Sequence, residues 1–189
     1  MANRFVDPTK KTGDLNGTWT FTNGSTTVQG SGGNAASVLS QGDYVKPSTT
    51  NEWYKVASIT NDNEFELAYA FAQDTQTDVT CEYNSEDGTS PDHAFCHINQ
   101  ATTDEVRAAG DVIYLRRGQT YVYEVTNIVF DEDGSPNNYI TLKGDDGTGW
   151  PDETGLGNPV IDFNNASKRI DVGWVNYWRF EDLEIKNSS

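Results

Sequence analysis

The chain has 189 residues, and 13 Lys and Arg against 29 Asp and Glu give it a formal net charge of -16. This length can bury a real core in one domain or two small ones, while the charge repels phosphate backbones and anionic lipid and so argues against nucleic-acid binding. We see no apolar run long enough to cross a membrane and no apolar signal-peptide core at the start, so we expect neither a membrane span nor standard export.

Turn-rich composition favours a mainly β fold, because only 35% of residues are apolar while Gly, Ser, Thr and Asn are abundant. In residues 17–30, Trp19 and Phe21 alternate with threonines up to Asn23-Gly24, a strong hairpin signal. Two more strands follow around a turn at residues 60–63, and another covers residues 77–84. We therefore predict a leader or attachment strand over residues 1–16 and a small antiparallel β-barrel or sandwich over residues 17–85.

A single amphipathic helix is expected between residues 90 and 110. Ser90 suits the N-cap, Pro91 the first helical position and Gly110 the stop. One modest apolar stripe at helical spacing is formed by Phe95, Ile98, Thr102 and Val106.

Beyond Gly110, short runs of branched and aromatic residues alternate with polar ones and are separated by Gly, Asp and Asn. The runs are "DVIYLRR", "YVYEV", "NIVF", "YITLKG", "PVIDF", "RIDVG" and "DLEIKN". This pattern is typical of a β-solenoid, in which short strands stack from coil to coil, although the uneven spacing also allows a second sandwich.

The stretch "DGTSPDHAFCHINQ", followed by "YITLKGDDG", "PVIDF" and "DLEIKNSS", resembles the opening of right-handed parallel β-helix proteins of the pectate-lyase-like superfamily. The resemblance implies that residues 86–189 form a cap helix and the first coils of such a β-helix, with the β module inserted after the leader. That module is similar to small β modules near the N-termini of tailed-phage fibre, spike and appendage proteins. Together these resemblances imply a virion location.

The two cysteines and two histidines lie close together in the sequence. A zinc site would need Cys81, His93, Cys96 and His97 to converge, yet residues 96 and 97 diverge on a helix and the spacing is not a standard ligand pairing. On a cap helix the two histidines would be surface residues. Cys81 and Cys96 remain candidates for a disulfide that would close a loop of about 15 residues, or for two buried free thiols.

Acidic turns supply the remaining candidate chemistry. Hard oxygen ligands for Ca²⁺ could come from Asp131, Asp133, Asp145 and Asp146, but the spacing is not that of an EF-hand, and acidic turns are usually only turns. We identify no catalytic residue, since no nucleophile, zinc-protease or phosphate-binding motif is present. No cofactor other than this candidate Ca²⁺ is expected.

Several aromatic residues are candidates for a subunit interface or a sugar contact. They are Tyr121, Tyr123, Trp174, Tyr177 and Trp178. The uncovered end of a solenoid is normally continued or buried, so we expect either that this sequence is the N-terminal part of a longer fibre or that identical subunits bury the open end. In both cases we expect a homo-oligomer, a trimer by analogy with the phage spikes.

Three functions fit this sequence. The first is a structural virion protein of a tailed phage that docks to capsid, neck or tail proteins and projects toward the host, with a host surface glycan as a further candidate partner. The alternative is a polysaccharide-degrading tailspike, a lyase or hydrolase, using carboxylates of residues 131–153, although about three or four coils leave little room for an extended groove. The third, a bacterial surface adhesin, is disfavoured by the missing export signal.

Overall fold

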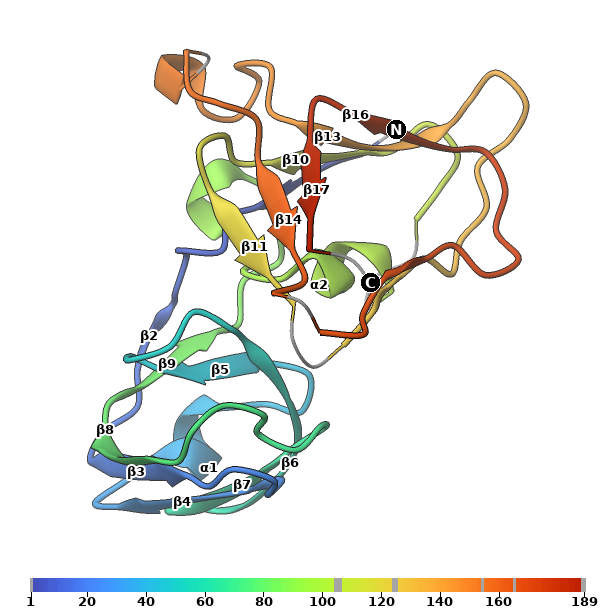
Figure 1. Ribbon diagram of the computed structural model, residues 1–189. Coiled ribbons are helices and arrows are strands. Elements are labelled where there is room, and N and C mark those ends of the chain that lie inside the picture. Colours follow the sequence, from blue (N-terminus) through green and yellow to red (C-terminus); the bar gives the residue numbers. More distant parts are fainter. Residues whose placement is uncertain (1, 104–106, 124–125, 154, 165, 188–189) are drawn as a thin grey trace. The chain divides into compact units, whose positions relative to one another are not determined.

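The computed structural model describes residues 2–103, 107–123, 126–153, 155–164 and 166–187 (Figure 1). The protein is mainly β, with antiparallel and parallel sheets. It divides into two compact units, one of Met1–Lys10 with Glu86–Ser189 and the other of Lys11–Ser85. We call these the parallel unit and the insert unit.

The insert unit begins earlier than the predicted boundary at residue 17. Strand β2 (Gly13–Asp14) pairs with β9 (Cys81–Asn84), and the buried Leu15 donates its backbone N–H to the carbonyl of Cys81. Residues 11–16 therefore belong to the antiparallel unit, and only the first ten residues form the leader.

One antiparallel sheet makes up the insert unit, in the order β2-β9-β5-β6-β7-β4-β3-β8. Its remaining elements are β3 (Thr18–Phe21), β4 (Thr27–Ser31), the short α1 (Ala35–Val38), β5 (Tyr44–Pro47), β6 (Tyr54–Asn61), β7 (Glu64–Leu67) and β8 (Gln76–Val79). The hairpin predicted at Asn23-Gly24 is confirmed by the β3–β4 pairing. The strand predicted over residues 77–84 is instead two strands, because β8 pairs with β3 while β9 pairs with β5 and β2.

Large aromatic side chains fill the interior of the insert unit. Trp19, Phe21, Phe65 and Phe71 are fully buried. The Trp19 ring contacts Phe65, Phe65 contacts Phe21 and Phe21 contacts Phe71, with centroid distances between 5.2 and 6.4 Å. Alternation in the sequence places Phe65, Leu67, Tyr69 and Phe71 on one face and predicts that all four are core residues, which is wrong for one of them. Tyr69 is 51% exposed, because β7 ends at Leu67 and the alternating face ends with it.

The strands of the parallel unit form three parallel sheets, in the orders β1-β10-β13-β16, β11-β14-β17 and β12-β15. The strands are β1 (Asn3–Val6), β10 (Val112–Leu115), β11 (Thr120–Val122), β12 (Ile128–Val129), β13 (Ile140–Gly144), β14 (Val160–Asp162), β15 (Ile170–Asp171), β16 (Trp178–Glu181) and β17 (Glu184–Lys186). β1 pairs with β10; from β10 onward consecutive strands lie in different sheets, and β10 to β14 each pair in parallel with the strand three places further along the chain (Figure 1). The chain thus passes each sheet in turn and builds successive layers.

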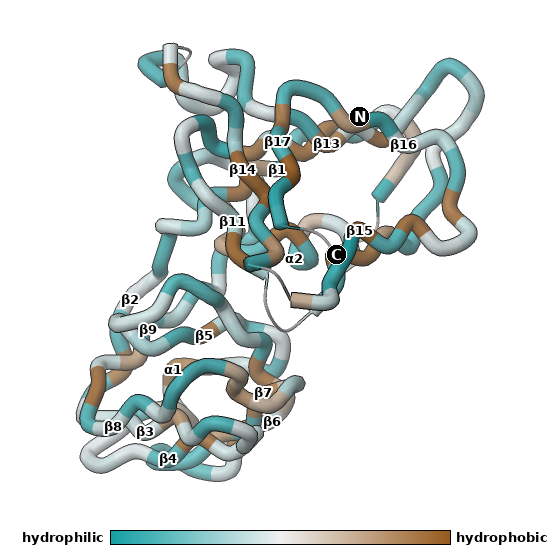
Figure 2. Tube along the Cα trace, viewed as in Figure 1, coloured by the Kyte–Doolittle hydropathy of each residue, from teal (hydrophilic) through white to brown (hydrophobic). Residues whose placement is uncertain are grey.

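Strand register stacks apolar residues into columns. Ile113 pairs with Leu142 and Leu142 with Phe180, while Tyr121 pairs with Ile161 and Ile161 with Ile185. The first two residues of each column are at most 1% exposed, whereas Phe180 is 39% exposed and Ile185 45%. The hydropathy colouring shows apolar positions recurring along β11, β14 and β17 (Figure 2). The third layer, β16 and β17, is therefore uncovered.

The predicted helix over residues 90–110 is wrong as a continuous element. Ser90 does cap a helical turn, but that turn is the 3₁₀ helix η1 (Pro91–His93), and α2 (Ile98–Thr102) starts separately. Between them Phe95 is extended, because its N–H donates to the Phe5 carbonyl and its carbonyl accepts from the Asp7 N–H. Pairing with β1 has replaced helical hydrogen bonds here.

The short α2 contributes side chains to the apolar core of the parallel unit. It contacts β1 and β12, and Ile98 and Ala101 are fully buried in the same core as Ile113 and Leu142. Of the predicted apolar stripe, Phe95, Ile98 and Thr102 are buried, and Val106 lies outside the described residues. A second 3₁₀ turn, η2 (Pro151–Glu153), follows β13.

Two isoleucines in one column test whether the third layer is uncovered. We expect Ile161→Ala to lower the free energy of unfolding by about 2–5 kcal/mol, because a buried side chain leaves a cavity. Ile185→Ala should cost less than about 1 kcal/mol, because nearly half of that side chain is already in water. Urea unfolding at low protein concentration measures both, and equal costs would show that Ile185 is covered in solution.

Candidate functional site

A group of side chains centred on an arginine lies at the carboxyl ends of the strands of the first parallel sheet. Asp7 follows β1 and Arg116 follows β10, so both project from the carboxyl ends of neighbouring parallel strands. Arg116 Nη1 donates to Asp7 Oδ2 at 2.8 Å, and its Nε donates to both carboxylate oxygens of Glu153 at 3.0 and 2.9 Å. The guanidinium also lies 5.8 Å from the ring centroid of Trp150. We call these four residues the Arg116 cluster.

Electrostatics within the Arg116 cluster favour the ionised forms of Arg116 and Glu153. Hydrogen bonds from Arg116 lower the pKa of Glu153, and the same contacts, chiefly with Glu153, raise the pKa of Arg116. Asp7 is 3% exposed and also accepts from the Thr9 N–H and hydroxyl. A carboxylate held in its charged form by an arginine is a poor general acid, so the cluster is suited to tying three chain segments together.

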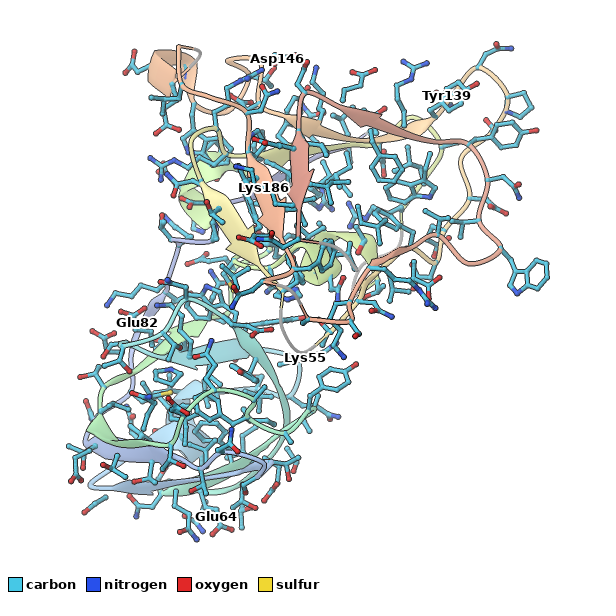
Figure 3. The ribbon with its side chains drawn as sticks, viewed as in Figure 1. Lys55, Glu64, Glu82, Tyr139, Asp146 and Lys186 are labelled. Carbon is cyan, nitrogen blue, oxygen red and sulfur yellow. The ribbon has the colours of Figure 1, made fainter. Side chains whose placement is uncertain are left out.

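Asp145 and Asp146, predicted as calcium ligands, organise the loop after β13. Asp145 is buried and accepts backbone N–H groups from Gly147, Gly149 and Trp150 at 2.9–3.0 Å. Asp146 accepts from the Thr148 hydroxyl at 2.6 Å and from Lys143 Nζ at 2.9 Å, and these bonds lower its pKa to about 2 (Figure 3). Both carboxylates already have donors within the loop.

Asp131 and Asp133 lie in the connection between β12 and β13. Asp133 Oδ1 accepts the backbone N–H of Asn176 at 2.6 Å, which joins this connection to the one before β16, and Asp131 is exposed. Within the described ranges, no group of three or more His, Cys, Asp or Glu is placed to hold a metal ion. The calcium prediction gains no support from the geometry.

The two cysteines are free and buried, so the structure contains two thiols in place of the candidate disulfide. Cys81 lies on β9 of the insert unit, where burial raises its pKa well above the ordinary value. Cys96 lies in the parallel unit, with its Sγ 3.3 Å from Gln100 Oε1. Each thiol is thus part of the interior of its own unit.

The surface position expected for the histidines is correct for His93 and wrong for His97. His93 is exposed, with Nδ1 2.7 Å from Glu86 Oε2, and this contact raises its pKa. His97 is 4% exposed because it is the N-cap of α2: its Nδ1 accepts from the Asn99 N–H, and its ring lies against Tyr123. Neither arrangement resembles a zinc site.

The five aromatic residues predicted for an interface differ in their exposure to solvent. Tyr121 and Tyr123 are 1% exposed, so their predicted interface role is wrong: the Tyr121 hydroxyl donates to the Val6 carbonyl at 2.7 Å, and the Tyr123 hydroxyl accepts from the Ile98 N–H at 2.8 Å. Trp178 is half-buried against Phe130 and donates Nε1–H to the Glu132 carbonyl. Only Trp174 and Tyr177 are exposed, Trp174 almost completely.

A second candidate site is the edge of the third layer. Strands β16 and β17 each end their sheet in the described pairings, and Phe180 and Ile185 present apolar surface there. Strand β16 was not among the strands predicted from the sequence, because "WRFE" places a charge on either side of Phe180. The Asp7–Arg116 contact was also missed, because its partners are 109 residues apart. Only the shared β1–β10 pairing brings them together.

No protein-family model, curated protein or solved structure matches this chain. In the described part of the chain, the helices are all too short to traverse a lipid bilayer.

Removal of the central arginine tests the structural reading of the Arg116 cluster. We expect Arg116→Met to lower the free energy of unfolding by about 2–4 kcal/mol, because it leaves the buried Asp7 carboxylate without its cationic partner. Arg169→Met is the matched control, since Arg169 is 72% exposed and pairs with Asp171 at 3.7 Å, and its cost should stay below about 0.5 kcal/mol. Equal effects in denaturant unfolding would contradict this reading.

Thiol titration distinguishes free cysteines from a disulfide. Without reductant, the native protein should react slowly with an aromatic disulfide reagent, because both thiols are buried and the raised pKa of Cys81 disfavours its thiolate. Denaturation should release two reactive thiols per chain, and one in Cys81→Ser. Finding none in denatured wild-type protein would establish the disulfide instead.

Proposed function

We propose that this chain is a structural protein of a tailed-phage virion, the attachment region of a fibre, spike or other appendage. We further propose that the parallel unit is the start of a right-handed parallel β-helix and that the insert unit is a small antiparallel β-barrel or sandwich. The observation that carries the proposal is the strand order, in which successive strands join different sheets and each sheet grows by parallel addition.

A mechanical role fits this construction. Each added layer extends every sheet by one hydrogen-bonded strand and every column by one apolar residue, so the unit lengthens along one axis by repetition. α2 covers the core beside β1, so the layers are stacked from a closed first end, as the base of a projecting appendage would be.

The sequence resemblance supplies the virion part of the proposal. The "DGTSP" lead places Ser90 as the N-cap of η1 and Pro91 at its start, and the Asp87 carboxylate accepts from the Thr89 N–H and hydroxyl. This local geometry agrees with the capped opening that the resemblance implies. Virion proteins of the capsid, neck or tail are then the proposed docking partners, and a host surface glycan is the proposed distal one.

The polysaccharide-cleaving alternative receives no support from the carboxylates named for it. Glycoside hydrolysis needs one carboxyl group that keeps a proton near neutral pH. Glu153 and Asp146 both have lowered pKa values, and Asp145 and Asp133 accept backbone N–H groups in turns. These groups stabilise loops.

Immunogold electron microscopy tests the virion proposal directly. An antibody raised against the purified chain should label one defined position on purified particles of the phage that encodes it, and excess free chain should abolish the label. Intact particles without label, alongside label on the host cell surface, would contradict the proposal and favour the adhesin.

Incubation with host capsular polysaccharide tests the enzymatic alternative. We expect no shortening of the polymer by the wild-type chain. Shortened product that is lost in Glu153→Gln, an isosteric change that removes the charge, would instead assign the Arg116 cluster to catalysis.

A further inference from the structure

We propose that Asn16 is a modification site, which deamidates spontaneously to aspartate and isoaspartate in the folded protein, and that the fold protects Asn23 from the same reaction. The chain contains two Asn-Gly pairs, Asn16-Gly17 and Asn23-Gly24, and a residue with a hydroxyl group follows each of them. This inference goes beyond the virion role and rests on the insert unit alone.

Deamidation at an Asn-Gly pair needs a backbone nitrogen that can reach the neighbouring side-chain amide. The glycine nitrogen gives up its proton to base and attacks the asparagine Cγ, and the Cγ–Nδ2 bond breaks as the amide nitrogen takes up a proton and leaves as ammonia. Water then adds to one of the two carbonyls of the resulting five-membered succinimide. Opening of one C–N bond gives aspartate, and opening of the other gives isoaspartate. Glycine favours the attack because it has no Cβ in the way.

The two Asn-Gly pairs are matched in exposure and in glycine conformation. Both asparagines and both glycines are exposed, and φ is +76° at Gly17 and +77° at Gly24. Neither the access of water nor the glycine backbone therefore distinguishes the pairs. Their hydrogen bonds do.

Asn23-Gly24 is held at both of its reacting groups. Asn23 Nδ2 donates to the carbonyls of Ala72 and Gln73 at 3.1 and 2.8 Å, and the Gly24 N–H donates to the Phe71 carbonyl at 2.8 Å. The leaving amide and the attacking nitrogen are thus both bonded to the segment that follows β7. These bonds must open before the reaction can start.

Asn16-Gly17 is anchored only through the backbone of Asn16. The Asn16 N–H donates to Asn34 Oδ1 at 2.8 Å, and the Asn16 carbonyl accepts from Trp19 Nε1 at 2.9 Å. Among the described residues, neither the Asn16 side-chain amide nor the Gly17 N–H makes a hydrogen bond. Both reacting groups are therefore available while the fold keeps the pair in place.

The isoaspartate product would also change the backbone at a closely packed point. Isoaspartate adds one carbon to the main chain between residue 16, whose carbonyl binds the buried Trp19, and Gly17. Gly17 packs tightly on β4, since a Cβ added there would lie 2.1 Å from the Ser31 carbonyl oxygen. Deamidation at Asn16 therefore acts on the start of β3 as well as on the surface charge.

Incubation of the folded wild-type chain tests the proposal. The protein is kept for several weeks at mildly alkaline pH, which favours deprotonation of the attacking nitrogen, and samples are digested with chymotrypsin. Cleavage after Trp19 and Phe21 places the two asparagines on different peptides, and mass spectrometry follows the conversion of each against a sample taken at the start. A parallel incubation in guanidinium chloride measures both sites in the unfolded chain. Circular dichroism checks that the native samples remain folded.

We expect Asn16 to convert at least about tenfold faster than Asn23 in the folded protein, because three hydrogen bonds protect Asn23-Gly24, and the two rates to become similar in the unfolded chain. Asn16→Gln is the matched variant: its longer side chain disfavours ring closure, so conversion at residue 16 should stop while the rate at Asn23 stays unchanged. Equal rates in the folded protein, faster conversion of Asn23, no conversion of Asn16, or the same ratio of rates in the folded and unfolded chains would overturn the proposal. The immunogold test of the virion role is independent of these outcomes.

Discussion

Parallel pairing between strands that are far apart in sequence is the constraint on which the parallel unit depends. Because the partners pair in a fixed register, each inward residue stacks on its equivalent one layer away, as Ile113 does on Leu142. A slip of one residue would turn the whole apolar set to the outside, so the buried columns themselves hold the register. The N-terminal strand β1 belongs to the same arrangement through its pairing with β10.

The outer face of the first sheet follows the same register. Phe5 stacks on Tyr114 at 5.5 Å, and Lys143 of the next layer lies 5.8 Å from the Tyr114 ring. Trp150 meets Phe5 edge-on and brings the loop after β13 against this face. The loop is fixed from within by Asp145 and from outside by the bond between Arg116 and Glu153. Charged and aromatic groups here act as structural ties across layers.

This use of charge bears on function. The acidic turns suggested cation binding or paired catalytic carboxylates, yet Asp133, Asp145, Asp146 and Glu153 accept hydrogen bonds from backbone, threonine, lysine or arginine donors. What distinguishes the parallel unit is its asymmetry, with α2 over the core at one end and half-exposed Phe180 and Ile185 at the other. A structural role is therefore a better proposal for these carboxylates than catalysis.

Local patterns in the sequence determined the β-rich composition, the hairpin at Asn23-Gly24, the N-cap at Ser90 and most strands after Gly110, since alternation and turn residues act over a few positions. Tertiary structure alone decided that Phe95 pairs with β1 instead of continuing a helix, that Tyr121 and Tyr123 are buried, and that Asp7 meets Arg116. Each of these depends on contacts between segments distant in the chain, where a buried hydrogen bond outweighs local propensity. Strand β16 could not be predicted from the sequence, because charged residues stand on both sides of Phe180 and weaken the apolar pattern. It is identified as a strand only by its parallel pairing with β13.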